Sequence, residues 1–460
     1  MAAEEFIRYC YAEPSAVTES GRPSPDQAES PPRFGLRLTS FHEEAEAADL
    51  APVLFMGRLT RPALSARSLT ALSAVAAARY TPAPFALPSL YDPIINVGGG
   101  LLRFEAFSGC AGVYAAFDVL PEGLDGSFLA EGSTNVDFNS PMLAALGGVG
   151  LADQMSLCVG PGDVAVGFDN GTVVERQVPL PERWLRALGV VPVYLAGSEF
   201  IGEMSGPQAV KMCRNIPLTG IKGDHYLIRR GSELTLSTLP GRGTDLALGG
   251  LNRLHLAGPL LASARLVKVF AHPSGSAVTW RIYLDGLRFS LTLSRSASRG
   301  FSGEGAGLND LVGTLTPETL AAAAPNRHFA DGGPKTPDGQ APAMAAMGLL
   351  GYDLDGQAYF HRRLPFKLGR LLALNPRLKN AGKLLAAGKV EISFRADGAV
   401  EGRVEGSGVW HSVLLSGAEE RCTCLWSSKY RNSRGPCKHI LAVKEAAVEA
   451  AVVDHGAVRH

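Results

Sequence analysis

The segment CTCLWSSKYRNSRGPCKH at 422–439 constrains the fold more than any other stretch, because it gathers three of the seven cysteines and a histidine into 18 positions. The other four cysteines stand singly, each more than 40 residues from the next; they are Cys10, Cys110, Cys158 and Cys213. A lone cysteine in an apolar run is typical of a small buried hydrophobe. We therefore expect the chemistry of the cysteines to lie at 422–439.

The spacing of these four donors predicts a zinc site. Zinc takes four tetrahedral ligands, and pairs of ligands usually lie close in sequence. Cys422 and Cys424 form one pair and can lie on the same side of a strand end, because side chains two residues apart point the same way. Cys437 and His439 form the second pair, after Pro436 and at the start of a helical pattern. A Cys3His set leaves no open coordination position, which predicts one structural Zn2+.

The motif and its surroundings resemble a known family. Residues 395–450, with the strand pattern VEGRVEGSGVWHSVLL before the motif and a helix after it, resemble a SWIM zinc finger, which is a ββα module. Segments such as LRFEAFSGCAGVYAAFDVL and LLGYDLDGQAYFHRRLPF resemble a bacterial SWIM-containing family. That resemblance implies two protein partners, a MoxR-type AAA+ ATPase and a von Willebrand A-domain protein.

Changes of composition along the chain predict four parts. Residues 1–32 hold a short strand and a segment rich in Pro, Ser and Glu, and 33–319 form a mixed region of unknown function. Residues 320–346 collect Pro, Gly and Ala without periodicity and are interpreted as a linker. Residues 347–460 form the C-terminal unit with the finger. The expected fold class is α+β, with a large β-rich N-terminal region and a C-terminal ββα zinc finger module.

Local patterns predict individual elements. Leu69, Leu72 and Val75 recur at helical spacing and predict a helix from Arg58, with Thr60 as its N-cap. Short apolar runs at 90–190 and 222–295 predict antiparallel strands, interrupted by a helix around 251–264. In the C-terminal unit we expect a strand pair at 349–363, a helix at 367–387 and strands joined by a turn at 397–398.

The loop of the motif is basic and aromatic, which leaves two functions open. Six basic residues and no acid lie between Arg421 and Lys444. The residues expected to contact a partner or phosphates are Lys429, Arg431, Arg434, Lys438, Trp426 and Tyr430. The chain as a whole has a net charge of zero, so it has no global field that attracts nucleic acid. We expect an adaptor or scaffold that binds protein through the finger, with nucleic-acid binding as the alternative.

An enzyme in the N-terminal region is the third interpretation, and the sequence favours it least. No phosphate-binding loop follows the glycines at 98–100, because no Lys-Ser/Thr comes after them. Isolated candidates for catalysis are Ser302, Glu304, His361 and the carboxylates Glu105, Asp118, Asp137 and Glu175, for which structural roles are the expectation.

The N-terminus and the hydropathy pattern predict a cytoplasmic protein with no membrane partner. MAAEEF carries two glutamates where a secretory signal would carry basic residues, and no run of about 18 apolar residues follows. The odd number of cysteines and their scatter favour reduced thiols.

Overall fold

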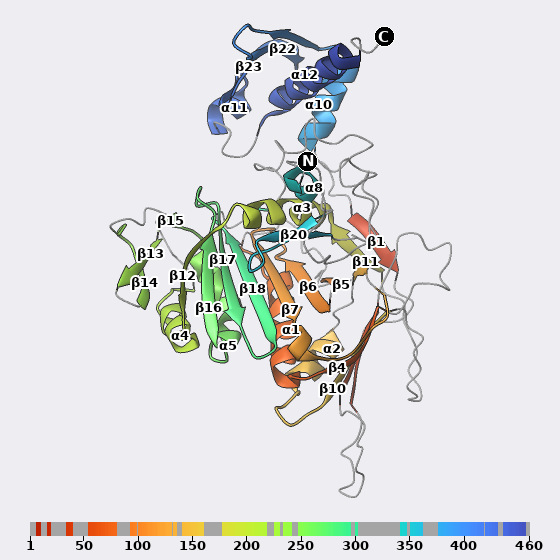
Figure 1. Ribbon diagram of the computed structural model, residues 1–460, viewed down its shortest axis with the longest axis vertical. Helices are drawn as coiled ribbons and strands as arrows, with labels where there is room; N and C mark the ends of the chain where they lie inside the picture. The colour runs from red at the N-terminus through yellow and green to blue at the C-terminus, as the bar shows by residue number, and fades with distance from the viewer. Residues whose placement is uncertain are drawn as a thin grey trace, which may run out of the picture.

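The structure is a computed structural model that describes 6–10, 16–19, 34–39, 54–80, 93–98, 100–130, 132–135, 140–160, 177–218, 225–230, 233–241, 247–295, 300–301, 341–346, 350–361, 376–417, 419–430 and 436–456. Within these ranges it is a mixed fold with many antiparallel strands in the N-terminal part and a small strand-helix unit at the C-terminal end, as the sequence predicts (Figure 1). The N-terminal part, which we call the body, comprises the described residues from 6 to 361.

An eight-stranded antiparallel sheet forms the centre of the body (Figure 1). Its spatial order is β12 (Glu199–Met204), β16 (Leu266–Ala271), β17 (Ala277–Tyr283), β18 (Leu287–Ser294), β7 (Val113–Val119), β6 (Leu101–Phe107), β5 (Ile94–Gly98) and β9 (Gly132–Asn135). Strands β7 and β18 are buried along their whole length. Both faces of the sheet are therefore covered at these two central strands, although β18 alternates its apolar residues with the buried polar residues Arg288, Ser290, Thr292 and Ser294.

Smaller sheets and helices surround the central sheet. A mixed five-stranded sheet has the order β2 (Ala16–Glu19), β3 (Phe34–Thr39), β10 (Met155–Gly160), β4 (Phe55–Leu59) and β8 (Leu124–Phe128). A three-stranded sheet has the order β14 (Glu233–Ser237), β13 (His225–Arg230) and β15 (Ala247–Leu248), and β1 (Phe6–Cys10) pairs with β11 (Gln177–Pro181). The helical elements are α1 (Pro62–Ala77), η1 (Pro121–Gly123), α2 (Ser140–Gly147), α3 (Glu182–Ala196), α4 (Gly206–Arg214), η2 (Leu251–Ala257), α5 (Gly258–Leu261) and α8 (Ala341–Ala346).

The start of the first helix differs from the sequence prediction. Arg58 belongs to β4, and α1 begins only at Pro62 after an N-cap at Arg61. The Thr60 hydroxyl does not cap the helix, because it donates to the carbonyl of Glu122 at 2.9 Å. The Thr60 side chain, which the local sequence predicts as the N-cap, therefore makes a tertiary hydrogen bond instead.

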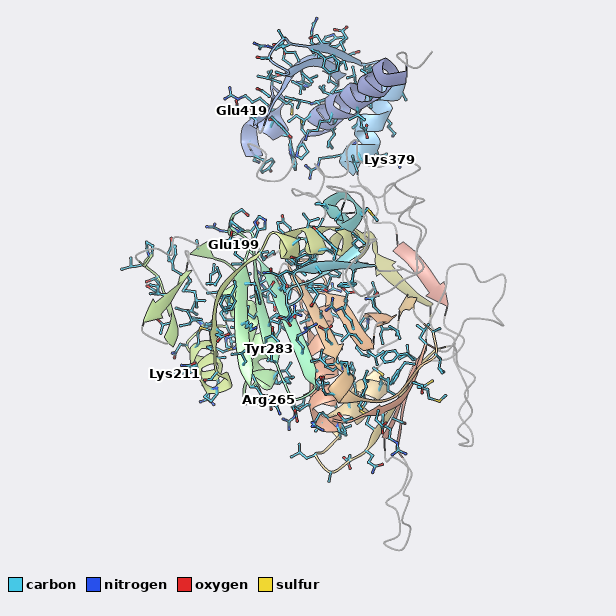
Figure 2. All side chains as sticks on the ribbon, viewed as in Figure 1. Glu199, Lys211, Arg265, Tyr283, Lys379 and Glu419 are labelled. Atoms are coloured by element: carbon cyan, nitrogen blue, oxygen red, sulfur yellow. The ribbon has the colours of Figure 1, made fainter. Side chains whose placement is uncertain are left out.

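The hairpin of β19 (Leu350–Asp353) and β20 (Ala358–His361) is attached to the central sheet through ion pairs. Asp353 accepts from Arg281 at 2.6 Å, and Asp355 accepts from Arg288 at 2.6 Å. The hydroxyl of Tyr283, labelled in Figure 2, also donates to Asp355. The predicted boundary at 320–346 lies mostly outside the described residues and stays a prediction, but this hairpin, expected in the C-terminal unit, contacts the body.

The C-terminal unit from 376 to 456, which we call the finger unit, has a four-stranded antiparallel sheet. Its elements are α10 (Pro376–Ala386), β21 (Val390–Phe394), β22 (Val400–Gly406), β23 (Val409–Ser416), β24 (Glu419–Cys422), α11 (Leu425–Tyr430) and α12 (Lys438–Gly456). The predicted turn at 397–398 is present, with Gly398 at a φ of 81°. Helix α12 packs on one face of the sheet (Figure 1).

Candidate metal centre

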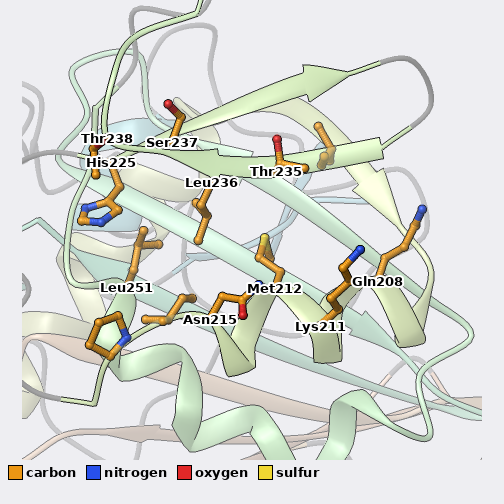
Figure 3. Close-up of a pocket in the computed structure, with 13 residues that line it drawn as sticks. Gln208, Lys211, Met212, Asn215, His225, Thr235, Leu236, Ser237, Thr238 and Leu251 are labelled. Atoms are coloured by element: carbon orange, nitrogen blue, oxygen red, sulfur yellow. The ribbon is translucent and has the colours of Figure 1, made fainter.

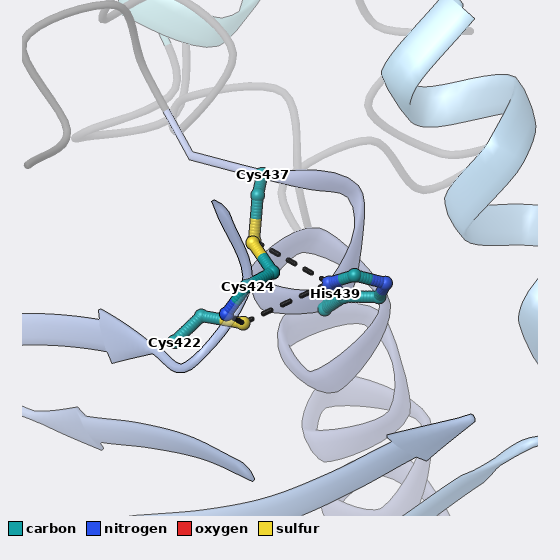
Figure 4. Close-up of side chains that lie close together, drawn as sticks. All are labelled: Cys422, Cys424, Cys437 and His439. Atoms are coloured by element: carbon teal, nitrogen blue, oxygen red, sulfur yellow. Dashed lines mark hydrogen bonds between the residues drawn. The ribbon is translucent and has the colours of Figure 1, made fainter. Parts of the chain in front are cut away.

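Three element ends bring the four predicted ligands together. Strand β24 ends at Cys422, Cys424 comes just before α11, and Cys437 and His439 flank the first residue of α12. Their ligand atoms all lie within 4.8 Å of one another, and all four residues are buried. The Nδ1 atom of His439 lies 3.7 Å from Sγ of Cys422 and 3.9 Å from Sγ of Cys437 (Figure 4).

Backbone amides direct the sulfur atoms toward this common point. The amide of Ile440 donates to Sγ of Cys437, the amide of Ser427 to Sγ of Cys424 and the amide of Cys424 to Sγ of Cys422, each at 3.5 Å. The first amides of a helix carry partial positive charge, which favours thiolate over thiol. The local fold therefore prepares the sulfurs to act as ligands.

Without a cation the three sulfurs cannot all ionise. Hydrogen bonds from Cys422 and Cys437 lower the pKa of Cys424 well below its usual range. The hydrogen bond to Cys424 raises the pKa of Cys422 far above it. One thiolate is thus shared by two thiols, and a divalent ion would replace those two protons. A soft, closed donor set of three sulfurs and one imidazole fits zinc, and we assign one structural Zn2+ to it.

The strands leave room for the imidazole only because position 406 is a glycine. A Cβ added at Gly406 would lie 2.3 Å from Nε2 of His439, which is too close for any real contact. The ring of His411 stacks on that of His439 with their centroids 4.3 Å apart. Gly406 and His411 therefore fix the plane of the ligating ring from β22 and β23.

The metal site is also part of the core of the finger unit. The buried cluster around it consists of Val404, Val413, Ile440 and Val443 together with the three cysteines. Strand β22 approaches α12 closely, since a Cβ at Gly402 would meet the side chain of Val443 at 2.3 Å. Removing the metal would therefore leave one thiolate and two thiols inside the small core that holds the helix to the sheet.

The structure places four of the six predicted contact residues. Trp426 and Tyr430 lie on α11 with ring centroids 4.5 Å apart, and the ammonium of Lys429 lies 5.4 Å from the centroid of Tyr430. Lys438 is half-buried at the start of α12. Arg431 and Arg434 lie outside the described residues.

Two residues that the sequence prediction missed change the character of the basic loop. Arg421 pairs with Glu419 at 2.5 Å, and Lys444 pairs with Glu420. Both acids lie just before the acid-free window, on the strand that enters the site. An inspection of the window alone could not show that its first and last cations are neutralised.

The predicted carboxylates do not form a bare acidic pair. Asp118 accepts from Arg103 at 2.6 Å and from Arg288 at 2.8 Å, whereas Glu105 accepts from Asn96 and Tyr114. Of the scattered thiols, Cys110 and Cys213 are buried as expected, whereas Cys158 on β10 is only half-buried. His361 ends β20, but its side chain lies outside the described part of the chain, as do Ser302, Glu304, Asp137, Glu175 and the side chain of Cys10.

A search of the described helices finds none with the length and apolar character that a bilayer crossing requires.

Comparison with known proteins supports the assignment of the site. Residues 411–447 match the family model of the SWIM zinc finger, a stretch that contains all four ligands. No curated protein matches the chain. Among solved structures, the Proliferating Cellular Nuclear Antigen from Entamoeba histolytica is similar with 8% identity and a TM-score of 0.34, covering 53% of this chain and 100% of its own. The PCNA2-PCNA3 complex from Sulfolobus tokodaii is similar with 9% identity and a TM-score of 0.33, covering 53% of this chain and 100% of its own.

Proposed function

We propose that this protein is an adaptor whose zinc finger docks a protein partner. A closed Cys3His centre offers no position to a substrate, so the metal holds a binding surface in shape instead of carrying out a reaction. The surface in question is the sheet face turned away from α12, which we call the outer sheet face. It includes Glu391, Ser393, Glu401, Arg403, Glu405, Trp410, Ser412, Leu414 and Arg421.

The observation that carries the proposal is the mixed, mutually paired charge of this face. Arg403 approaches Glu391 at 3.8 Å, and Glu401 pairs with Arg395 at 3.0 Å. The guanidinium of Arg403 also lies 5.1 Å from the ring centroid of Trp410, which is 44% exposed. An exposed tryptophan with an arginine beside it, surrounded by charges of both signs, is typical of a protein-binding surface.

Paired cations argue against phosphate contact as the main role. Affinity for nucleic acid comes largely from cations that neutralise phosphates and release counterions. Arg421 and Lys444 already neutralise Glu419 and Glu420, so two of the six cations of the loop region are occupied. The loop retains an aromatic pair beside Lys429, and this keeps nucleic-acid binding as the alternative that the experiment must separate.

The resemblance supplies the two partners to be tried first, a MoxR-type AAA+ ATPase and a von Willebrand A-domain protein. The proposal includes them as candidates. Each would be purified separately and titrated against the full-length chain in a binding assay that reports stoichiometry.

The test compares Trp410→Ala with Lys429→Ala, a matched change outside the outer sheet face. We expect wild type and Lys429→Ala to bind one of the two proteins. Trp410→Ala should lose at least tenfold in affinity while keeping its zinc, because a tryptophan that the partner buries contributes about 2 kcal/mol or more at such a site. Submicromolar, salt-dependent binding of random duplex DNA that Lys429→Ala weakens, with no protein binding, would contradict the proposal.

A further inference from the structure

A cavity in the body lies far along the chain from the metal centre and has no role in the proposed docking (Figure 3). Its volume is about 310 Å³, at the lower end of the range for small-ligand sites. Helix α4 and the residues after it form one wall, and β14 forms the facing wall. Most of the lining thus comes from two elements that pack against each other without closing the space between them, and His225 of β13 and Leu251 of η2 complete it.

The middle of the cavity is apolar. Met212, Ile216, Leu234 and Leu251 are buried in its walls, and Leu236 is half-buried opposite α4 (Figure 3). Leu218 and Leu239, which follow the lining residues Pro217 and Thr238, are 67% and 72% exposed. Exposed leucines beside an apolar cavity extend the surface on which a hydrocarbon chain can be buried.

Two polar side chains lie near opposite ends of the cavity (Figure 3). Lys211 projects from α4 and is the only charged residue among the described lining residues. At the other end, the Nδ1 atom of His225 is buried and has no hydrogen-bond partner among the residues that the structure describes. A buried, unpaired ring nitrogen costs free energy unless a ligand or a water molecule contacts it.

Helix α4 is held in place at both ends, so the cavity is preformed. At its start, the amide of Ser205 donates to Oε1 of Gln208 at 2.9 Å in a capping box. After its end, Nε2 of His255 lies 2.8 Å from the carbonyl oxygen of Ile216, and its Nδ1 lies 3.6 Å from Sγ of Cys213. A ligand therefore need not order this wall when it binds, which preserves affinity.

We infer that this cavity binds a small amphiphilic carboxylate. The aliphatic chain packs between Met212 and Leu236, and the carboxylate pairs with the ammonium of Lys211. A hydroxyl or carbonyl group at the far end of the ligand hydrogen-bonds to the ring of His225, which turns its buried Nδ1 toward the cavity to make that bond. No acidic side chain lines the described part of the cavity, so its charge is complementary to an anion and unfavourable for an amine.

The test titrates the full-length protein with octanoate and with octan-1-ol, which has the same chain length without the charge. We expect saturable 1:1 binding of octanoate by calorimetry. Lys211→Met should weaken octanoate about three- to tenfold and leave octan-1-ol unchanged, because only the ion pair is lost. Arg214→Met removes the same charge from an exposed position of α4 outside the lining and should leave both ligands unchanged.

His225 is tested with 8-hydroxyoctanoate. We expect it to bind wild type about fivefold more tightly than octanoate, and His225→Phe to abolish that difference, because one hydrogen bond is lost. Circular dichroism of each variant confirms that it is folded. No saturable binding of octanoate to wild type up to millimolar concentration, or equal weakening by Lys211→Met and Arg214→Met, would overturn the inference.

Discussion

The body and the finger unit differ in the kind of side chain that forms their cores. Among the described residues, the largest fully buried side chains, such as Trp280, Phe104 and Phe117, all lie in the body. In the finger unit, three of the seven buried members of the main cluster are cysteine ligands. A small unit buries too little apolar surface to offset the conformational entropy of folding, and a structural metal makes up the difference.

Charge is also handled differently in the two regions. The body buries ion pairs in its interior, as with Asp118, whose side chain is 1% exposed between Arg103 and Arg288. The finger unit keeps most of its described pairs at the surface, where Arg403 and Glu391 are more than half exposed, and the pair of Lys444 and Glu420 is its more buried exception. Buried pairs are costly to break, whereas surface pairs contribute little. We therefore expect the body to lose stability when a buried charge loses its partner, and the finger unit to lose stability when it loses its metal.

Chelation should give the largest effect and confine it to the finger unit. Metal binding and folding are coupled in such modules, with an apparent free energy of about 10 kcal/mol or more. We expect a strong zinc chelator to expose 376–456 to protease while the body stays resistant. The measurement is limited proteolysis with fragments identified by mass spectrometry. If both regions become sensitive together after zinc removal, the two regions do not have separate sources of stability.

Asp118→Asn should give the next largest effect, in the body alone. The change removes the buried negative charge that Arg103 and Arg288 share, leaving them only the more exposed Asp353 and, for Arg288, Asp355. Breaking a buried pair costs about 3–5 kcal/mol. We expect a lower Tm of the body with zinc content unchanged, measured by calorimetry and elemental analysis. Asp285→Asn, which removes the partner of Arg61 and Arg265 at the surface, is the control and should change the Tm little. Equal effects of the two changes would contradict the role given to burial.

Gly406→Ala should weaken zinc binding by a smaller amount. The new methyl group would press on Nε2 of His439, and disturbing the surroundings of a ligand typically lowers metal affinity about 10- to 100-fold. Competition with a chromophoric chelator measures this affinity. Gly382→Ala on α10 has open space at its Cβ and should leave zinc affinity unchanged. Unaltered affinity in Gly406→Ala would show that β22 does not position the ring.

Acid should release the β19–β20 hairpin from the central sheet at a higher pH than the pH at which that sheet unfolds. Burial alone would raise the pKa of Asp353, but the charges of Arg281, Arg288 and Arg103 outweigh it and lower that pKa to about 2. Because this pKa is lower than the value of about 4 in the unfolded chain, the ionised carboxylate stabilises the folded state fully above about pH 4. This stabilisation is lost as the pH falls toward 2. We expect the protection factors for hydrogen exchange of 350–361, taken relative to the intrinsic rate at each pH, to fall in that window. Protection factors that are unchanged down to pH 2 would contradict the ion-pair attachment.

The metal centre could be predicted from the sequence, whereas the interior of the body could not. All four ligands lie within 18 residues, so their spacing alone indicates one site. The partners of the buried ions are distant in sequence, since Asp118 and Arg288 are 170 residues apart and meet only through the register of β7 and β18. The same limit applies to the cavity, because no local pattern relates Lys211 on α4 to His225 on β13.

The zinc content of purified, full-length protein is the most direct measure of whether the Cys3His set holds one structural Zn2+. Elemental analysis should find about one zinc ion per chain in the wild type and in Cys158→Ser, and almost none in Cys437→Ser. Of the two cysteines, Cys437 belongs to the closed Cys3His set and Cys158 does not. A well-folded wild-type protein without zinc, or a Cys437→Ser variant that retains a full equivalent, would contradict the account of the finger unit given above.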